Sequence, residues 1–303
     1  MRGQPDRYGS RLLTQPRLTI AIPIHAGAKW IDGILDTVGK APEWSRIVIS
    51  DATHRDDAVG RLAETLGDDR RVEVKSRPEK LDWIRHANLL LAEAETPFFC
   101  WMPQDDMVSP DYFELLVSAL DEHPDRVLAF PTVVRKVTKG RLRTRTVGEI
   151  PYPSPPIDLG RARPEEEAVR LLNEWNLALG CWRGVFRTSV ARPAPATVDC
   201  ADLVWAFSMA LAGNFIEVEE ARYLKRFHRG SALHSMRWQG MSSAMNLYRV
   251  EVEARLGTNP ARVDPVMAGV QRYLRFKHRL IMYTLRLRPL AALALDRPRP
   301  ALE

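Results

Sequence analysis

The stretch that decides the fold reads Pro97-Phe98-Phe99-Cys100-Trp101-Met102-Pro103-Gln104-Asp105-Asp106. A short apolar run rich in aromatic side chains is typical of a buried strand. The run ends in two adjacent carboxylates, which repel each other unless a cation or hydrogen-bond donors compensate them. Hard oxygen ligands suit Mg²⁺ or Mn²⁺. The stretch therefore predicts a strand that presents a site for a divalent cation and a phosphate-bearing substrate.

Short β-branched runs alternate with segments of helical periodicity ahead of this stretch. The predicted strands are 18–22, 46–50, 71–75 and 98–101, and the predicted helices are 29–38, 56–66 and 81–95. Such alternation predicts a Rossmann-like α/β fold, a mostly parallel sheet with helices on both faces. Ligands in these sheets bind at the carboxyl ends of the strands. We expect His25, Asp51 and the Asp105-Asp106 pair, which all follow predicted strands, to lie at one rim.

The pattern changes after the carboxylate pair. The predicted elements are a helix over 110–122, a strand over 127–130, a hairpin over 133–147, helices over 164–180 and 199–212, and a strand over 215–218. From residue 242 the chain is predicted to be helical, with Gly257 ending one helix and Asp264-Pro265 beginning another that reaches about residue 288. We expect one main domain over 17–240 and a C-terminal helical extension over 241–303.

Composition narrows the class of protein. A chain of 303 residues with 45% hydrophobic side chains can bury one large core. The three cysteines show no CxxC spacing, which favours a reducing cytosol over a disulfide framework or a zinc knuckle. No apolar run approaches the roughly 20 residues that a spanning helix needs, and the first residues do not resemble a signal peptide. We expect a soluble, cytoplasmic protein, or one that lies on the inner face of the cell membrane.

The net charge of +6 is concentrated in the tail. Residues 271–303 carry eight Lys and Arg against two Asp and Glu, so the rest of the chain is neutral overall. Because no nucleic-acid motif interleaves this charge with aromatics, no nucleic-acid partner is expected. The 271–295 segment predicts either peripheral contact with an anionic membrane surface or an ordinary C-terminal helix packed on the domain.

Six motifs occur in a fixed order. They are Ile20-Ala21-Ile22-Pro23-Ile24-His25, Ile47-Val48-Ile49-Ser50-Asp51-Ala52-Thr53, Arg85-His86-Ala87-Asn88, Met102-Pro103-Gln104-Asp105-Asp106, Val198-Asp199-Cys200-Ala201-Asp202-Leu203 and Phe227-His228-Arg229-Gly230-Ser231. This ordered set, over roughly residues 17–235, resembles the family 2 glycosyltransferases of the GT-A fold. The resemblance implies an inverting transfer from a nucleoside-diphosphate sugar to a hydroxyl of a glycan, a lipid-linked acceptor or a small molecule.

The resemblance also implies roles for the donor-side residues. Asp51 would hydrogen-bond the base or ribose of the nucleotide, and Pro23 and His25 would line the same pocket. Arg85 and Lys80 would be available for the diphosphate. A carboxylate at a strand end can also cap its own turn, and a basic helix face can simply be solvated, so these alternatives stand beside the functional ones.

For the reacting centre, the resemblance implies Mn²⁺ or Mg²⁺ bound by Asp106 and His228, with Asp105 orienting the diphosphate or the sugar hydroxyls. Asp202 would be the general base that an inverting transfer needs, with Asp199 as the alternative. Both acids also suit the N-terminus of a helix for capping and dipole reasons.

Three positions depart from the family pattern: Ser50 replaces an acid, Gln104 precedes the metal pair, and Ala201 stands where Glu is usual. A non-catalytic nucleotide- or glycan-binding protein, or a scaffold, is therefore the alternative function. Trp182 is expected either to stack against an acceptor sugar or to belong to the core.

Overall fold

The structure is a computed structural model of the chain. It describes residues 15–139, 145–151, 163–173, 180–194, 201–227 and 241–295. Two of the predicted site residues, Asp199 and His228, lie outside these ranges.

The first half of the chain forms the parallel part of the sheet. The strands are β1 (Leu18–Ile24), β2 (Ser45–Asp51), β3 (Val72–Ser76) and β4 (Phe98–Trp101), and the intervening helices are η1 (Ala28–Trp30), which leads into α1 (Ile31–Lys40), α2 (Ala58–Leu66) and α3 (Trp83–Ala92). The strands lie in the order β3-β2-β1-β4, and each neighbouring pair is parallel. Parallel neighbours need a crossover helix between them, so the predicted alternation and the observed sheet agree.

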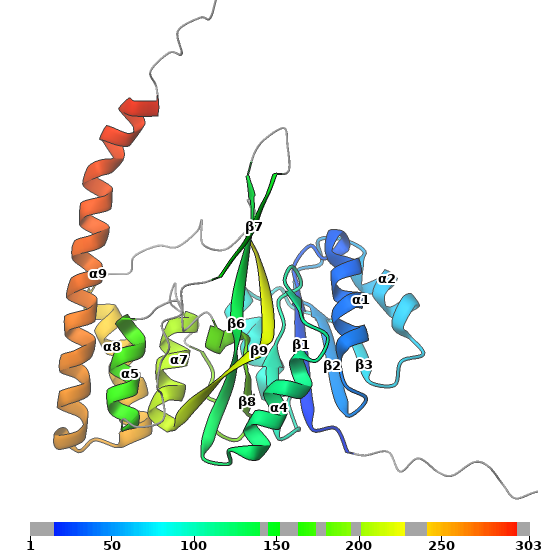
Figure 1. Ribbon diagram of the computed structural model, residues 1–303, viewed down its shortest axis with the longest axis horizontal. Helices are drawn as coiled ribbons and strands as arrows, with labels where there is room; N and C mark the ends of the chain where they lie inside the picture. The colour runs from blue at the N-terminus through cyan, green and yellow to red at the C-terminus, as the bar shows by residue number, and fades with distance from the viewer. Residues whose placement is uncertain are drawn as a thin grey trace, which may run out of the picture.

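Helices cover both faces of this sheet (Figure 1). Successive residues of a strand point to opposite faces, and β4 shows the division. Phe98 and Cys100 join a core cluster with residues of α1, α2 and α4 (Tyr112–Glu122). Phe99 and Trp101 join a second cluster with residues of α3, α5 (Pro164–Asn173) and α7 (Ala201–Ala212). The predicted two-sided α/β architecture is thereby confirmed.

The second half of the sheet is mixed. The strands are β5 (Met107–Val108), β6 (Arg126–Lys139), β7 (Arg145–Pro151), β8 (Val185–Arg187) and β9 (Asn214–Phe227). The main path is β3-β2-β1-β4-β8-β6-β9-β5, and β7 pairs with β6 as the predicted hairpin. β6 and β9 are parallel, whereas β8 is antiparallel to both of its neighbours. β5 and β8 were not predicted, because strands of two and three residues are too short to show an alternation of apolar and polar side chains.

An aromatic cluster fills the core beneath the second half of the sheet. Trp182 stacks on Trp101 with ring centroids 4.1 Å apart, and Trp205 of α7 meets both rings edge-on. Only 6% of Trp182 is exposed, so this residue belongs to the core and does not offer a free face to a sugar. The cluster fixes the start of α7 against the end of β4.

Two C-terminal helices, α8 (Met241–Leu256) and α9 (Pro260–Leu295), pack against α5 and α7. Val252, Val270 and Leu274 share a core cluster with Trp205, so this part of the chain is seated directly on the sheet domain. Whether 241–303 is a separate unit stays a prediction.

The start of α9 was predicted at the wrong residue. The helix begins at Pro260, not at Asp264-Pro265, because Asn259 accepts the backbone N–H of Ala261 at 3.0 Å and proline suits the first helical position. Gly257 lies just beyond α8 with a φ of 74°, as predicted for a residue that ends a helix.

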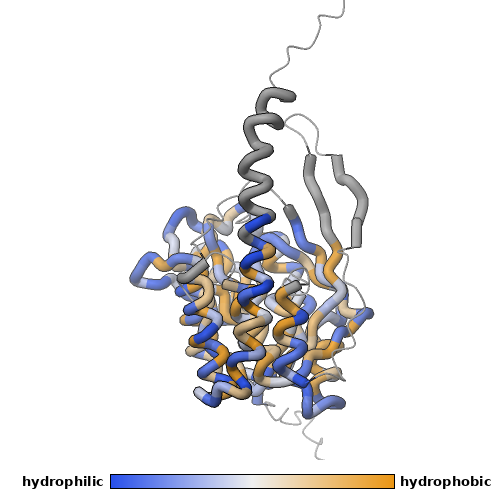
Figure 2. Tube along the Cα trace, turned by 90° about the vertical axis from the view of Figure 1, so that its left-hand side faces the viewer, coloured by the Kyte–Doolittle hydropathy of each residue, from blue (hydrophilic) through white to orange (hydrophobic). Residues whose placement is uncertain are grey.

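The far end of α9 extends past the body of the protein (Figure 1). Along its described part, hydrophilic and hydrophobic residues alternate (Figure 2). Among the described residues, no helix combines the length and the apolar character that crossing a membrane requires.

Candidate active site

The loops that follow β1 and β4 are joined at the carboxyl-end rim of the sheet. The side-chain amide of Gln104 accepts the backbone N–H of His25 at 3.0 Å and donates to the backbone carbonyl of His25 at 2.7 Å. A side chain on Gly27 would collide with Ile24 and come within 3.3 Å of the Gln104 amide oxygen. The structure therefore brings the predicted residues Pro23 and His25 next to the Asp105-Asp106 loop, and Gln104 makes that junction.

Asp51 ends β2 at the same rim, and its buried carboxylate organises the turn that follows. It accepts the backbone N–H and the hydroxyl of Thr53, each at 2.7 Å, and the backbone N–H of His54 at 3.2 Å. His54 has a φ of 51°, a left-handed conformation that this Asp-centred turn stabilises. The turn-capping alternative for Asp51 is thus present in the structure, and contact with a nucleotide stays a prediction.

Ser50 faces the other side of β2, where it belongs to a buried polar network. Arg77 Nε donates to Ser50 Oγ at 2.8 Å, and the hydroxyl lies 2.9 Å from His86 Nε2. Arg77 also donates two hydrogen bonds to the carboxylate of Glu93, at 2.6 and 2.7 Å. Burial, with a further contribution from the Arg77 charge, lowers the pKa of His86 to about 4. Ser50 therefore replaces an acid at a position that joins α3 to the sheet.

This network predicts an acid-sensitive stability. The unfolded chain protonates His86 near its ordinary pKa of 6.5, whereas the folded chain resists protonation down to about 4. The neutral His86 ring therefore contributes fully to the free energy of unfolding above pH 6.5. As the pH falls toward 4, up to about 3 kcal/mol of that contribution is lost. Urea unfolding at pH 7 and pH 4.5 should show a smaller acid loss for His86→Gln than for the wild type. His123→Gln, on the surface at the end of α4, is the control, and an equal acid loss in all three proteins would contradict the assignment.

Asp106 is enclosed by donors and cations from distant parts of the chain. Its side chain is fully buried. Tyr223 donates its hydroxyl to one carboxylate oxygen at 2.7 Å, and the backbone N–H of Arg226 donates to the other at 2.8 Å. Arg183 Nε and Lys225 Nζ lie 3.6 and 3.8 Å from the carboxylate. Asp106 thus ties the end of β4 to the end of β9.

These surroundings compensate the charge of Asp106 without a cation, and ligation of a divalent cation by Asp106 stays a prediction. A metal ligand must present an oxygen lone pair toward the cation and substrate, and the carboxylate of Asp106 is already compensated by two hydrogen bonds and two positive charges. In the part of the chain that the structure describes, no group of three or more His, Cys, Asp or Glu is placed to hold a metal. Asp105, which is half-buried, is the carboxylate of the pair that reaches the surface.

Asp202 lies in the first turn of α7, where one of its carboxylate oxygens accepts the backbone N–H of Leu203 at 2.9 Å. Burial raises the pKa of Asp202, and the charge of Arg183 partly opposes that shift. A raised pKa brings a carboxylate closer to the range in which it can take a proton during a reaction. Ala201 beside it is fully buried in the aromatic core, so a small residue suits the place where the family has Glu.

Arg85 lies in the first turn of α3, close to the rim. Asp82 caps this helix by accepting the backbone N–H groups of Ile84 and Arg85, and its carboxylate is 3.4 Å from the Arg85 guanidinium. On the same helix, the amide of Asn88 donates to the carbonyl of Ala194 at 2.7 Å and accepts its N–H at 2.8 Å. The Arg-His-Ala-Asn motif therefore contains an exposed cation, Arg85, and a residue, Asn88, that fixes the segment around Ala194.

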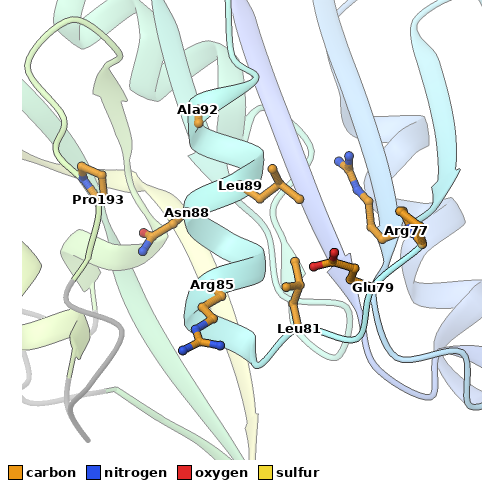
Figure 3. Close-up of a pocket in the computed structure, with 9 residues that line it drawn as sticks. Arg77, Glu79, Leu81, Arg85, Asn88, Leu89, Ala92 and Pro193 are labelled. Carbon is orange, nitrogen blue, oxygen red and sulfur yellow. The ribbon is translucent and has the colours of Figure 1, made fainter.

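A groove of about 620 Å³ runs beside α3. Figure 3 shows that one wall comes from α3 and the other from the loop after β3. The lining residues are Arg77, Pro78, Glu79, Leu81, Arg85, Asn88, Leu89, Ala92 and Pro193. The groove shares Arg85 with the predicted donor site. Its lining does not include Asp51, Asp105, Asp106 or Asp202.

Sequence reasoning missed Arg183, Tyr223 and Lys225. Tyr223 and Lys225 are alternate residues of β9, so they share a face, but only the paired sheet reveals that this face meets Asp106. Arg183 lies between the aromatic core and β8, with a side chain 6% exposed and a pKa that its anionic neighbours raise despite burial. The sequence signal for Arg183 was its position next to Trp182, and its burial became visible in the structure.

The α/β sheet thus carries Asp51, Asp105 and Asp106 at its carboxyl-end rim, and Asp202 lies in the first turn of α7, near Arg183. The model of glycosyl transferase family 2 matches residues 19–188, which is more than half of the chain. The chain belongs to this family and is a glycosyltransferase. No relative was found among curated proteins.

Solved structures show the same fold. Staphylococcus aureus TarS 1–349 in complex with UDP-GlcNAc is 16% identical, with a TM-score of 0.60, over 83% of this chain and 70% of that one. GalNAc-T7 with UDP, GalNAc and Mn²⁺ is 14% identical, with a TM-score of 0.54, over 79% of this chain and 48% of that one. These likenesses confirm the GT-A architecture.

Proposed function

We propose that this glycosyltransferase moves a sugar from a nucleoside-diphosphate sugar to a hydroxyl acceptor with inversion of configuration. The observation that supports the proposal is the proximity of the buried Arg183 to two carboxylates, those of Asp106 and of Asp202 in the first turn of α7. The nucleotides in the TarS and GalNAc-T7 structures support the donor class.

In the proposed reaction, the nucleotide lies against the turns that follow β1 and β2, which contain Pro23, His25 and Asp51. Arg85 would contact the phosphates. The carboxylate of Asp202 takes the proton of the acceptor hydroxyl as the hydroxyl oxygen bonds to the anomeric carbon. The bond from that carbon to the diphosphate breaks, and the electron pair leaves with the diphosphate. Holding both reactants at one rim supplies much of the rate enhancement.

Mn²⁺ or Mg²⁺ as a cofactor stays part of the proposal, supported by the Mn²⁺ in the GalNAc-T7 structure. Such a cation, when bound, would neutralise charge on the leaving diphosphate. Asp105 is the described carboxylate that could contact it, and His228 is the other predicted ligand. Direct ligation by Asp106 stays a prediction, although hydrogen bonds and cations already compensate its charge.

The acceptor is proposed to be a glycan or a lipid-linked sugar, reached from the cytoplasmic side of the membrane. On α9, Arg272, Arg275 and Arg279 are exposed, and Phe276 is 65% exposed, a combination that suits an anionic lipid surface. Co-sedimentation with phosphatidylglycerol vesicles tests this: Arg272→Gln with Arg275→Gln should reduce binding, and unchanged binding would remove the membrane proposal.

A thermal-shift screen tests the proposed donor class. UDP, GDP, dTDP and CMP are each added with and without Mn²⁺, and at least one nucleotide is expected to raise the melting temperature. A ligand at about 100 times its dissociation constant stabilises the fold by about 2.7 kcal/mol. No shift with any nucleotide would favour the non-catalytic scaffold instead.

A further inference from the structure

Gln104 holds the loop that follows β1 by both backbone polar groups of one residue. Its amide oxygen accepts the N–H of His25 at 3.0 Å, and its amide nitrogen donates to the carbonyl of His25 at 2.7 Å. The two residues are 79 positions apart in the chain. A side-chain amide carries an acceptor and a donor in one plane, as a backbone peptide does. Gln104 therefore fixes both the position and the orientation of the backbone at His25.

The next residue of this loop, Ala26, has a left-handed backbone conformation with a φ of 51°. Residues other than glycine adopt this conformation uncommonly, and alanine has no polar side chain that could stabilise it locally. Among the residues that the structure describes, the other non-glycine residue with a positive φ is His54, in the turn after β2. There the carboxylate of Asp51, in the same turn, accepts the N–H of His54. The hold on Ala26 comes from a distant part of the chain, through the bonds of Gln104 to the preceding residue.

A second side chain fixes the same loop two residues beyond Ala26. The carboxylate of Asp56, which precedes α2, accepts the backbone N–H of Ala28 at 2.9 Å with one oxygen and that of Ala58 at 3.2 Å with the other. The loops that follow β1, β2 and β4 thus meet in one junction. A strained backbone persists where its surroundings determine it from several sides, and such positions cluster at functional sites.

We propose that Gln104 is a positioning residue for the nucleoside half of the donor, and that it acts through the backbone of residues 25–28. This inference rests on the proposed function, in which the nucleotide lies against the turns that follow β1 and β2. A loop that is held in its binding conformation before the donor arrives loses little conformational entropy on binding. Without the two hydrogen bonds of Gln104, Ala26 is free to leave the left-handed region, and nucleotide binding must restore it.

The neighbouring Asp105 offers a different route by which a change at Gln104 could affect the donor. Asp105 follows Gln104 directly and is predicted to act on the diphosphate half. The two routes differ in the ligand that they affect. Loss of the held loop weakens a nucleoside monophosphate and a nucleoside diphosphate by the same factor, whereas displacement of Asp105 weakens the diphosphate alone.

Isothermal titration in buffer that contains MnCl₂ throughout tests the proposal. The probes are the 5′-monophosphate and the 5′-diphosphate of the nucleoside that the thermal-shift screen selects from uridine, guanosine, thymidine and cytidine. Gln104→Met, which keeps the length of the side chain and removes both hydrogen bonds, should weaken the binding of each probe at least tenfold, by factors that agree within threefold. The control is Gln15→Met, the same change at an exposed residue ahead of the amino end of β1, which should match the wild type.

Each outcome decides a different point. If Gln104→Met binds both probes as the wild type does, or loses the diphosphate alone, the positioning role is overturned while the proposed function stands. If the wild type binds none of the four nucleosides as phosphates, the proposed function fails and this inference fails with it. If Gln104→Met does not fold, Gln104→Asn decides, because its side chain keeps the amide but is one methylene shorter and cannot make both bonds with the loop in place. A folded Gln104→Asn with the affinities of the wild type would overturn the proposal.

Discussion

Asp202→Asn is expected to reduce sugar transfer about a thousandfold and to leave nucleotide binding within a few-fold of the wild type. The amide keeps the shape of the side chain and can still accept the Leu203 N–H, but it cannot take a proton from the acceptor. General-base catalysis typically contributes 10² to 10⁴ in rate. Initial rates of nucleotide release, measured with saturating donor, give the comparison.

The matched control is Asp199→Asn, the alternative base, which should retain most activity. An inactive Asp199→Asn beside an active Asp202→Asn would transfer the role to Asp199.

The pH profile of the wild type supplies a second measurement of the role of Asp202. Because the base must be deprotonated and burial raises the pKa of Asp202, activity should fall on the acid side at a pH above the ordinary carboxylate value of 3.8. A profile without that acid limb would contradict the assignment.

Asp106→Asn is expected to destabilise the fold by about 3 to 5 kcal/mol. The substitution leaves the buried charges of Arg183 and Lys225 without their carboxylate, and removing one partner of a buried ion pair typically costs this much. For a chain of this size, the loss corresponds to a fall in melting temperature of roughly 5 to 15 °C. Differential scanning calorimetry without nucleotide or metal measures it.

Asp105→Asn, the half-buried neighbour, is the control and should change stability by less than about 1 kcal/mol. The comparison separates two roles for Asp106. A carboxylate that serves only as a metal ligand is an uncompensated anion in the metal-free protein, so its replacement would leave stability unchanged or increase it. Stability of Asp106→Asn equal to that of Asp105→Asn would therefore contradict the role of Asp106 in joining β4 to β9.

The parallel half of the fold could be predicted because its signals are local. β1, β2 and β4 are largely apolar runs, β3 alternates apolar and polar residues, and helical periodicity separates the four. Polar residues that form the rim follow or end β1, β2 and β4. The start of α9 was misjudged although Asn259 and Pro260 form an ordinary helix start, because the prediction followed the later Asp-Pro pair. The sequence could not indicate β5 or β8, whose stability comes from pairing with distant strands.

The internal arrangement of the site depended on contacts that no local pattern encodes. Asp106 and Asp105 are neighbours with opposite surroundings, and the residues that enclose Asp106 come more than 70 positions later in the chain. Likewise, Ser50 appears as a departure from the family pattern until Arg77 and His86 are seen around it. Identity at a motif position was predictable, whereas the direction in which each side chain faces was not.

The central claim is that the rim containing Asp202 transfers sugar from a nucleotide donor with inversion. The most direct test is time-resolved ¹H NMR of the wild type with α-linked sugars of the nucleotide that the thermal-shift screen selects, with water as the acceptor and Asp202→Asn as the control. We predict that the wild type hydrolyses at least one of these donors and that the β-anomer of the free sugar appears first, whereas the variant leaves that donor intact. Release of the α-anomer first, or a wild type that binds the nucleotide and leaves every donor of the series intact, would contradict the account.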